Sequence, residues 1–398
     1  MTNPDGVPTT SCQVCEIDVP AGAFCGYCGS HLASRRGDGP PWLRLRAYSA
    51  AAGEHVLRPS VTSTLFPHLH HRAQGPFRVG LIILVIALLA FAVLRWQAPL
   101  VAVSALGLPV LFHLYLHEAD LYADLPRRAL LIIAVVSAGL GVGWAWLTGA
   151  TIAQSYAVAF QASIEFKQPL ADGLAIPVSG AIVMLVPIAL ARTSHVGTHE
   201  SLDGFVIGAI AAMSFTAAAT LTRLAPQFST GLMARDRPIF GLIAEAGIRG
   251  VAMSLTAAAA GAMVGVALWF TCPNQAHQHQ GQWLAGPAPA VTAVLIGYAV
   301  LGLTDASPVP ETPQLVIHLV VALLMVVALR MIVHMALLRE QHDPITQEPL
   351  LCEHCGHVVP DMAFCPACGV ATRASSRTSR AQRREVRPVH VEPPPEGP

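Results

Sequence analysis

Eight of the nine cysteines form two groups of CxxC pairs, one near each end of the chain. In both groups, nine residues separate the two pairs. Two residues between cysteines allow one tight turn to present both thiolates to one ion, and a short hairpin brings the second pair round to complete a tetrahedral four-sulfur site. We therefore predict two structural zinc ions, one held by Cys12, Cys15, Cys25 and Cys28 and the other by Cys352, Cys355, Cys365 and Cys368.

The two groups are also an internal repeat. Written from the first cysteine, CQVCEIDVPAGAFCGYCG and CEHCGHVVPDMAFCPACG share Val, Pro, Ala, Phe and the final Gly besides their cysteines. Ribbons of this size have almost no core, so the metal supplies most of their folding free energy, on the order of 10–16 kcal/mol in comparable peptides. If both ribbons lie on one side of a membrane they are able to meet, and we predict a joint module in which the surfaces around Phe24 and Phe364 touch.

Other chemistry for these cysteines is less well matched to their spacing. Redox activity of the CxxC pairs is one alternative, but two pairs recurring at one fixed spacing are more typical of metal binding. A four-thiolate site has no open position for water, so we do not expect catalysis by zinc. Neither ribbon has the dense basic and aromatic surface that nucleic acid requires, which favours a protein partner.

The ninth cysteine, Cys272, precedes His277 and His279 in a loop, where three flexible ligands lack the support that metal sites need.

The elements that must carry these ribbons are membrane helices. The chain is 53% hydrophobic and 12% charged, with a mean hydropathy of +0.53, whereas soluble domains carry about 25% charged residues. Apolar windows near the roughly 20 residues needed to cross a bilayer recur along the sequence. We predict an all-α polytopic membrane bundle with a small β zinc ribbon at each terminus. Its eight spans are expected at about 79–96, 98–117, 129–149, 173–191, 203–222, 250–270, 284–303 and 315–338.

Three features predict the orientation of the chain in the membrane: the even number of spans, the position of the arginines and the reducing compartment that the cysteines need. An even number of spans returns both termini to one side, and cysteine pairs that bind metal indicate the reducing cytosol. Arginines before the first span and after the last agree with cytosolic termini. The Ala-, Gly- and Arg-rich composition indicates a GC-rich bacterial source, so we expect the bacterial inner (cytoplasmic) membrane. One loop disagrees, because Arg223, Arg235 and Arg237 fall on the outer side; a re-entrant segment near 240–247 would change the count.

These observations divide the chain into five parts. They are an N-terminal zinc ribbon (1–32), an Arg/Pro-rich linker (33–78), a multi-pass transmembrane domain (79–338), a C-terminal zinc ribbon (339–370) and an Arg/Ser/Pro-rich tail (371–398). Segments of the tail's composition do not offset the entropy lost on ordering, so we predict that the tail is disordered. Its arginines would suit a solubilising role or contact with anionic lipid.

Ionisable residues in the predicted spans are further candidates. His113, His117 and Glu118 lie close to one helical face at the end of the second span, which suits a metal or proton site or an interfacial helix end. Arg330 and His334 are one turn apart in the eighth span, and such residues often face a partner or a cavity. Glu245 is one candidate partner for Arg330.

Two resemblances add to this interpretation. The sequence Asp203-Gly204-x3-Gly208-x6-Phe215 resembles part of the PrsW family of intramembrane proteases, and the similarity extends over about 115–269. Ala219 and Thr220, however, stand where that family has its Glu-Asn pair, and the other catalytic motifs are also missing. The whole chain resembles uncharacterised actinobacterial zinc-ribbon multi-pass membrane proteins, which implies a location and no activity.

We therefore interpret the sequence as a non-enzymatic integral membrane scaffold or regulator whose cytosolic ribbons recruit a protein partner. A PrsW-like relative, inactive for want of its catalytic residues, is the alternative. A transporter that uses Arg330 and His334 is a third possibility, against which the spans show no evident inverted repeat.

Overall fold

The computed structural model describes residues 8–13, 16–27, 29–33, 74–118, 124–159, 167–193, 200–230, 238–270, 286–339, 348–373 and 375–386. The chain divides into two compact units. The membrane unit comprises Arg72–Glu118 and Leu125–Glu340, and it contains the long helices. The terminal unit comprises Met1–His71, Ala119–Asp124 and Gln341–Pro398, and it contains both cysteine groups.

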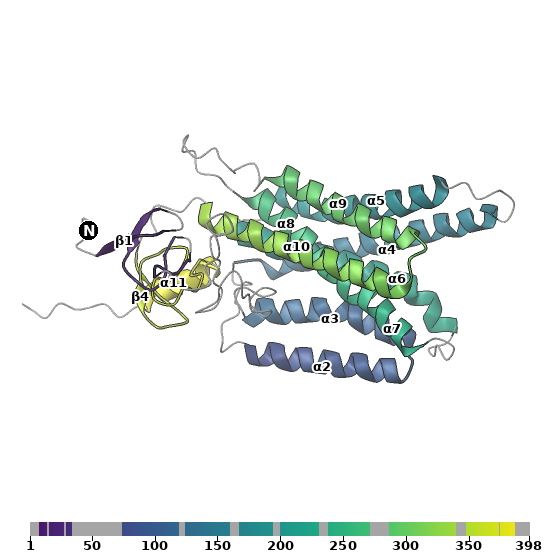
Figure 1. The fold of residues 1–398 in the computed structure, drawn as a ribbon, viewed down its shortest axis with the longest axis horizontal. Coiled ribbons are helices and arrows are strands. Elements are labelled where there is room, and N and C mark those ends of the chain that lie inside the picture. The colour runs from purple at the N-terminus through teal and green to yellow at the C-terminus, as the bar shows by residue number, and fades with distance from the viewer. Residues whose placement is uncertain are drawn as a thin grey trace, which may run out of the picture. The chain divides into compact units, whose positions relative to one another are not determined.

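The membrane unit is a bundle of long helices (Figure 1). They are α2 (Gln74–Val93), α3 (Gln97–Glu118), α4 (Arg127–Ala159), α5 (Lys167–Thr193), α6 (Ser201–Thr230), α7 (Ile239–Ala246), the π-helix η1 (Gly247–Ala252), α8 (Met253–Trp269), α9 (Pro287–Ala306) and α10 (Glu311–Arg339). In the described part of the chain, eight segments are long and apolar enough to cross a membrane. This agrees with the predicted multi-pass helical membrane protein.

The outside of this bundle is apolar, as expected where lipid and not water is the solvent. Only 11% of the window Pro76–Val93 in α2 is buried. Ile82, Ile83 and Ile86 on this helix are 57–61% exposed. A continuous apolar surface of this kind is unfavourable in water, whereas helices that satisfy their own backbone hydrogen bonds are stable in a bilayer.

The core of the bundle is the crossing of α6 and α8, which make the most extensive helix–helix contact. A Cβ atom added to Gly204 would lie 2.3 Å from the carbonyl oxygen of Gly265, and one added to Gly208 would lie 2.1 Å from that of Gly261. Two pairs of glycines, each four residues apart, therefore let the two backbones touch. Small residues at this spacing are a common basis of close helix packing in membranes.

The sixth span differs most from its predicted bounds. It was expected at 250–270, with a re-entrant segment near 240–247 as an alternative, but it runs continuously over Ile239–Trp269 through α7, η1 and α8. The π-helical turn lies against α3, where a Cβ atom added to Gly250 would overlap the Ser104 side chain. The added segment continues the same helical run, so the described residues still contain eight candidate spans.

The terminal unit contains two small lobes built on antiparallel hairpins. In the N-terminal lobe (residues 8–33), β1 (Thr9–Ser11) pairs with β2 (Asp18–Pro20), and Thr10 lies opposite Val19. In the C-terminal lobe (residues 348–373), β3 (Leu350–Leu351) pairs with β4 (Val358–Val359). The predicted linker falls almost entirely outside the described residues, and α2 begins at Gln74, five residues before the expected first span.

The start of the predicted disordered tail is instead a helix. It is α11 (Arg377–Glu385), and residues 387–398 lie outside the described part of the chain. Ser376 caps the helix by accepting a hydrogen bond from the Ser379 N–H. Composition alone was misleading here because the stabilising partner, Asp361 of the C-terminal lobe, is distant in sequence; it forms an ion pair with Arg384.

Candidate metal centre

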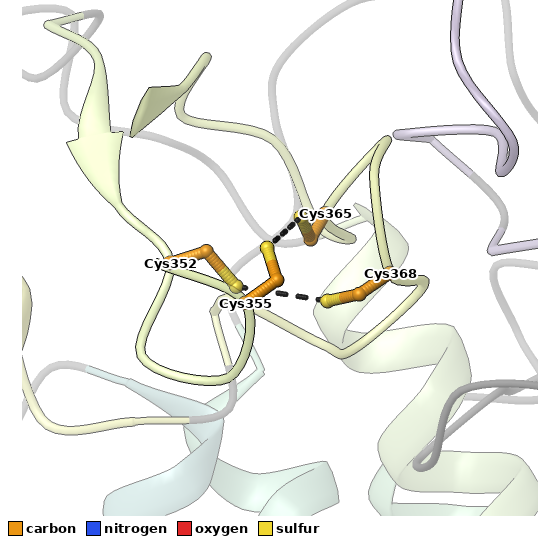
Figure 2. Close-up of side chains that lie close together, drawn as sticks. All are labelled: Cys352, Cys355, Cys365 and Cys368. Atoms are coloured by element: carbon orange, nitrogen blue, oxygen red, sulfur yellow. Dashed lines mark hydrogen bonds between the residues drawn. The ribbon is translucent and has the colours of Figure 1, made fainter. Parts of the chain in front are cut away.

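The C-terminal lobe gathers four cysteine side chains into one cluster (Figure 2). The Sγ atoms of Cys352, Cys355, Cys365 and Cys368 all lie within 4.8 Å of one another. Two of the separations are 3.7 Å, from Cys352 to Cys368, and 3.8 Å, from Cys355 to Cys365. Four sulfurs bound at about 2.3 Å to a tetrahedral zinc ion lie about 3.8 Å apart. The cluster therefore has the dimensions of a zinc site, and its sulfurs are too far apart for disulfides.

Two similar turns place the cysteine pairs. After β3, the Cys352 N–H donates to the His357 carbonyl, and the Gly356 N–H donates back to the Cys352 carbonyl, each at 2.8 Å. The second pair repeats this pattern, with the Gly369 N–H donating to the Cys365 carbonyl. Gly356 and Gly369 have φ of 72° and 76°, values at which a side chain would be strained. Each turn thus depends on a glycine just after its second cysteine.

Electrostatics within the cluster favour a bound dication. Hydrogen bonds from Cys365 and Cys368 lower the pKa of the Cys352 thiol below its usual range. The hydrogen bond to Cys352 in turn raises the pKa of Cys365 to about 12, and hydrogen bonds to Cys352 and Cys365 raise that of Cys368. The close thiols therefore do not all lose their protons readily, since their mutual hydrogen bonds lower the pKa of Cys352 and raise those of Cys365 and Cys368. A divalent cation removes this conflict because it binds the thiolates and displaces their protons.

The ligand set is closed. Cys352, Cys365 and Cys368 are buried, and Cys355 is half-buried. With four protein sulfurs on a tetrahedral ion, no position remains for water or substrate. The site suits a structural role in folding the lobe.

The N-terminal lobe repeats the backbone of the C-terminal lobe with an offset of 340 residues. Five backbone hydrogen bonds of the N-terminal lobe have counterparts 340 positions later in the chain. They run from the N–H to the carbonyl group in the pairs Cys12–Ile17, Glu16–Cys12, Cys25–Ser30, Gly29–Cys25 and Leu32–Ala23. Glu16 has a φ of 60°, matching the turn at Gly356. Cys12 and Cys25 are buried, whereas Cys15 and Cys28 lie outside the described residues. A complete metal-ligand group is therefore seen in the C-terminal lobe, and the second predicted site is not shown.

The two lobes contact each other, as predicted. The Phe24 N–H donates to the Pro366 carbonyl at 3.0 Å, and the Phe364 N–H donates to the Gly26 carbonyl at 2.9 Å. Because Phe364 and Pro366 are the repeat counterparts of Phe24 and Gly26, these two bonds are related by a pseudo-twofold axis. The lobes thus pair like the two halves of an isologous dimer within one chain.

Small residues on one lobe face larger residues on the other. A Cβ atom added to Gly22 would lie 2.6 Å from the Pro366 carbonyl oxygen, and one added to Gly26 would lie 2.5 Å from the Met362 sulfur. In the repeat, Gly22 corresponds to Met362 and Gly26 to Pro366. The N-terminal lobe therefore supplies two recesses, and the C-terminal lobe supplies the groups that fill them.

The arginines of α11 bind the C-terminal lobe. Arg384 Nη2 lies 2.6 Å from Asp361 Oδ2, and the Asp361 side chain is only 7% exposed. Arg383 donates to the Thr372 carbonyl, and burial lowers its pKa. At the other end of α11, the Arg377 N–H donates to the carboxylate of Asp124, within the same unit. These arginines therefore hold the helix in place, a role that the lipid-binding hypothesis did not include.

The ionisable residues predicted in the membrane are described only in part, and those that are described belong to no metal-ligand group. His113 and His117 are exposed on α3, and the Glu118 side chain lies outside the description. Arg330 is half-buried on α10, three residues before the end of the apolar window Glu311–Val333. The side chain of His334 is also outside the description. Among the described residues, the four-cysteine cluster is the sole group with metal-ligand geometry.

Two polar contacts in the bundle were not predicted. Glu245, considered above as a partner for Arg330, accepts a hydrogen bond from Gln97 at 2.6 Å and lies 3.5 Å from Arg249. The i,i+4 spacing of Glu245 and Arg249 was the available signal. His318 is fully buried with Nε2 3.2 Å from Asp305 Oδ1, a contact between neighbouring helices that sequence spacing does not reveal.

The glycines that carry the resemblance to the PrsW family, Gly204 and Gly208, lie at the crossing of α6 and α8. Their spacing thus has a reason in helix packing. Comparison of the chain with protein-family models, with curated proteins and with solved structures finds no match. The features of the chain that bear on its function are therefore the cysteine cluster, the paired lobes and the membrane bundle.

Proposed function

We propose that the chain is a non-enzymatic membrane scaffold whose two zinc ribbons form one cytosolic module that recruits a protein partner. The observation that carries this proposal is the closed, buried four-cysteine cluster in a lobe that pairs with its own repeat. A closed ligand set supports a fold and offers no site for a substrate. Because the apolar helices belong to the same chain, the proposed module would act close to a membrane.

The proposal includes a second zinc ion in the N-terminal lobe, bound by Cys12, Cys15, Cys25 and Cys28. Its support is the repeated spacing and the matching backbone bonds on either side of Cys12 and Cys25. It also places both lobes in the cytosol, where reduced thiols remain available for zinc. In a bacterial cell this is the inner face of the cytoplasmic membrane.

The experiment combines metal analysis with partner capture. The full-length chain is purified from membranes in detergent, and zinc per chain is measured by mass spectrometry. A variant with Cys352→Ser and Cys355→Ser removes the ligands of the C-terminal site. Cys272→Ser is the matched control, because it removes a thiol outside both groups.

We expect zinc in the wild type and in the control, and less zinc in the double variant. Proteins cross-linked in cells to the wild type and to the control should be missing from the double variant. Equal capture by all three chains would rule out recruitment by the ribbons. If the wild-type protein contained no zinc, redox activity of the CxxC pairs would become the favoured interpretation.

A further inference from the structure

His318 is an ionisable side chain inside the membrane bundle, and none of its surface is exposed. It lies on α10 within the candidate span Glu311–Val333, next to Asp305 on the last turn of α9. The Asp305 side chain, in contrast, is 45% exposed. Ionisable residues buried in a membrane domain are costly, and they often mark binding sites or paths for ions and protons. The pair therefore suits a role that the cysteine cluster does not fill.

The contacts of the His318 ring show which of its nitrogens carries a proton. Nδ1 lies 2.9 Å from the Gln314 carbonyl oxygen. Because a carbonyl oxygen only accepts hydrogen bonds, Nδ1 is the donor, and in a neutral ring Nε2 then has a bare lone pair. Nε2 is buried 3.2 Å from Asp305 Oδ1, and it has no other hydrogen-bond partner among the described residues.

This geometry requires one more proton. A lone pair on Nε2 and a carboxylate oxygen repel each other, whereas a proton between them makes a charge-assisted hydrogen bond. The Gln314 side-chain amide donates to the same Oδ1 atom at 2.6 Å, which stabilises the carboxylate form of Asp305. The contacts thus fit a pair that holds one proton, with the positive charge on His318.

Other charged groups near the pair have contacts of their own. On the helices packed against α10 they are Arg223 of α6, Glu245 of α7 and Arg249 of η1, and Glu311 lies on the first turn of α10 itself. Helix α8 has no charged residue. Glu245 lies 3.5 Å from Arg249. Arg223 bonds Thr148 at 3.3 Å and interacts electrostatically with Asp305, which also favours the carboxylate.

We propose that His318 and Asp305 form a proton-binding site in the membrane bundle, which takes up one proton from water at the end where α9 stops and α10 begins. Asp305 is the exposed member of the pair, so the proton reaches Nε2 of His318 past its carboxylate. The bound proton joins α9 to α10 across the connection 307–310. Its loss leaves a lone pair against a carboxylate and weakens this contact. The inference goes beyond the proposed function and does not depend on metal in the lobes.

Nitrogen NMR of the histidine rings tests the site in the full-length chain. The protein is labelled with isotopic histidine and purified in detergent, and His318→Gln assigns the His318 signals by their disappearance. We expect both ring nitrogens to be protonated at about pH 6, and Nε2 to lose its proton as the pH is raised to about 9. An unprotonated Nε2 at the lower pH, or a protonated one at the higher pH, would overturn the proposal.

A pair of carboxylate substitutions separates Asp305 from its neighbours. Asp305→Asn keeps the shape of the side chain and offers an amide hydrogen to Nε2, so His318 should be neutral at about pH 6. The matched control, Glu311→Gln, removes the same charge from the start of α10 and should leave both nitrogens protonated. A doubly protonated ring in Asp305→Asn, or a neutral ring in the control, would contradict the assigned pair.

Thermal unfolding measures what the proton does to the fold. The ion pair stabilises the folded bundle while His318 is protonated, so this stability is lost as the pH rises through the titration of His318. The unfolding temperature of the wild type should therefore fall over this range, and that of Asp305→Asn should fall less. Equal dependence on pH in the two chains would refute the link between the proton and the contact of α9 with α10.

Discussion

The substitution Gly22→Ala tests the contact between the lobes at its least adjustable point. The new Cβ atom would lie 2.6 Å from the Pro366 carbonyl oxygen and 3.0 Å from Pro366 Cβ. Pro366 lies in the turn from Cys365 to Cys368, which the hydrogen bond from the Gly369 N–H to the Cys365 carbonyl closes, so its backbone has little freedom to move. Overpacking of this kind costs about 1–3 kcal/mol, and the lobes are expected to relieve it by separating. Paired lobes should therefore become about 5- to 140-fold less favoured relative to separated lobes.

Hydrogen exchange resolved to single amides measures this change. The amides of Phe24 and Phe364 make the bonds between the lobes, so both should exchange about 5- to 140-fold faster in the variant, since exchange requires the lobes to open. The amides of Leu32 and Thr372 donate to carbonyls within their own lobes and serve as internal references. Their exchange should change much less.

The matched control is Ala21→Ser, at the exposed neighbouring position. It changes the side chain without adding an atom at Gly22, and it should leave the Phe24 and Phe364 amides protected. Exchange of these two amides within about twofold of wild type in Gly22→Ala would refute the assigned contact, because the expected cost lies well above that change. Faster exchange of all amides in the N-terminal lobe would instead indicate general unfolding.

Further predictions concern α11, the bundle and the metal. Arg384→Ala should free α11 to proteolysis, at a cost of roughly 1–3 kcal/mol, because it leaves the nearly buried Asp361 without its nearer cation; an undigested helix would contradict this. Gly208→Ala should lower the thermal stability in detergent by about 1–3 kcal/mol, since its Cβ would lie 2.1 Å from the Gly261 carbonyl oxygen. Gly143→Ala, which meets nothing within 4 Å, is its control and should be nearly neutral. Chelation of zinc at neutral pH should abolish amide protection in the C-terminal lobe and leave the helical circular dichroism of the bundle intact; loss of both together would show that the bundle depends on the metal.

Hydropathy located the membrane helices well because one property, transfer of an apolar side chain into lipid, dominates their formation. The sixth span was truncated in the prediction because Glu245 and Arg249 interrupt its apolar run. In the structure these two charges lie 3.5 Å apart, and Gln97 bonds the carboxylate. Neutralisation by neighbours is a property of three-dimensional contacts, which a sliding window does not include.

The four-cysteine cluster of the C-terminal lobe and the lobe pairing were predictable because the cysteine spacing and the repeat are visible in the sequence. The complementarity of the pair was harder to see, although its signal exists in the positions where the repeats differ. Gly22 and Gly26 occupy the places of Met362 and Pro366 in the repeat, so small residues of the N-terminal lobe face larger residues of the C-terminal lobe. Helix α11 had no such signal, because Asp361 is 23 residues from Arg384 in sequence.

The separation of 340 residues between Gly22 and Met362 also bears on how the protein is made. At about 5–20 residues per second, a ribosome needs roughly 17–70 seconds to synthesise the intervening chain. During that time every membrane helix emerges, while the N-terminal lobe waits without the groups that fill its recesses. A truncated product never supplies them. The pairing of the two lobes is thus a late step in the synthesis of the chain, because it follows the synthesis of the helices between them.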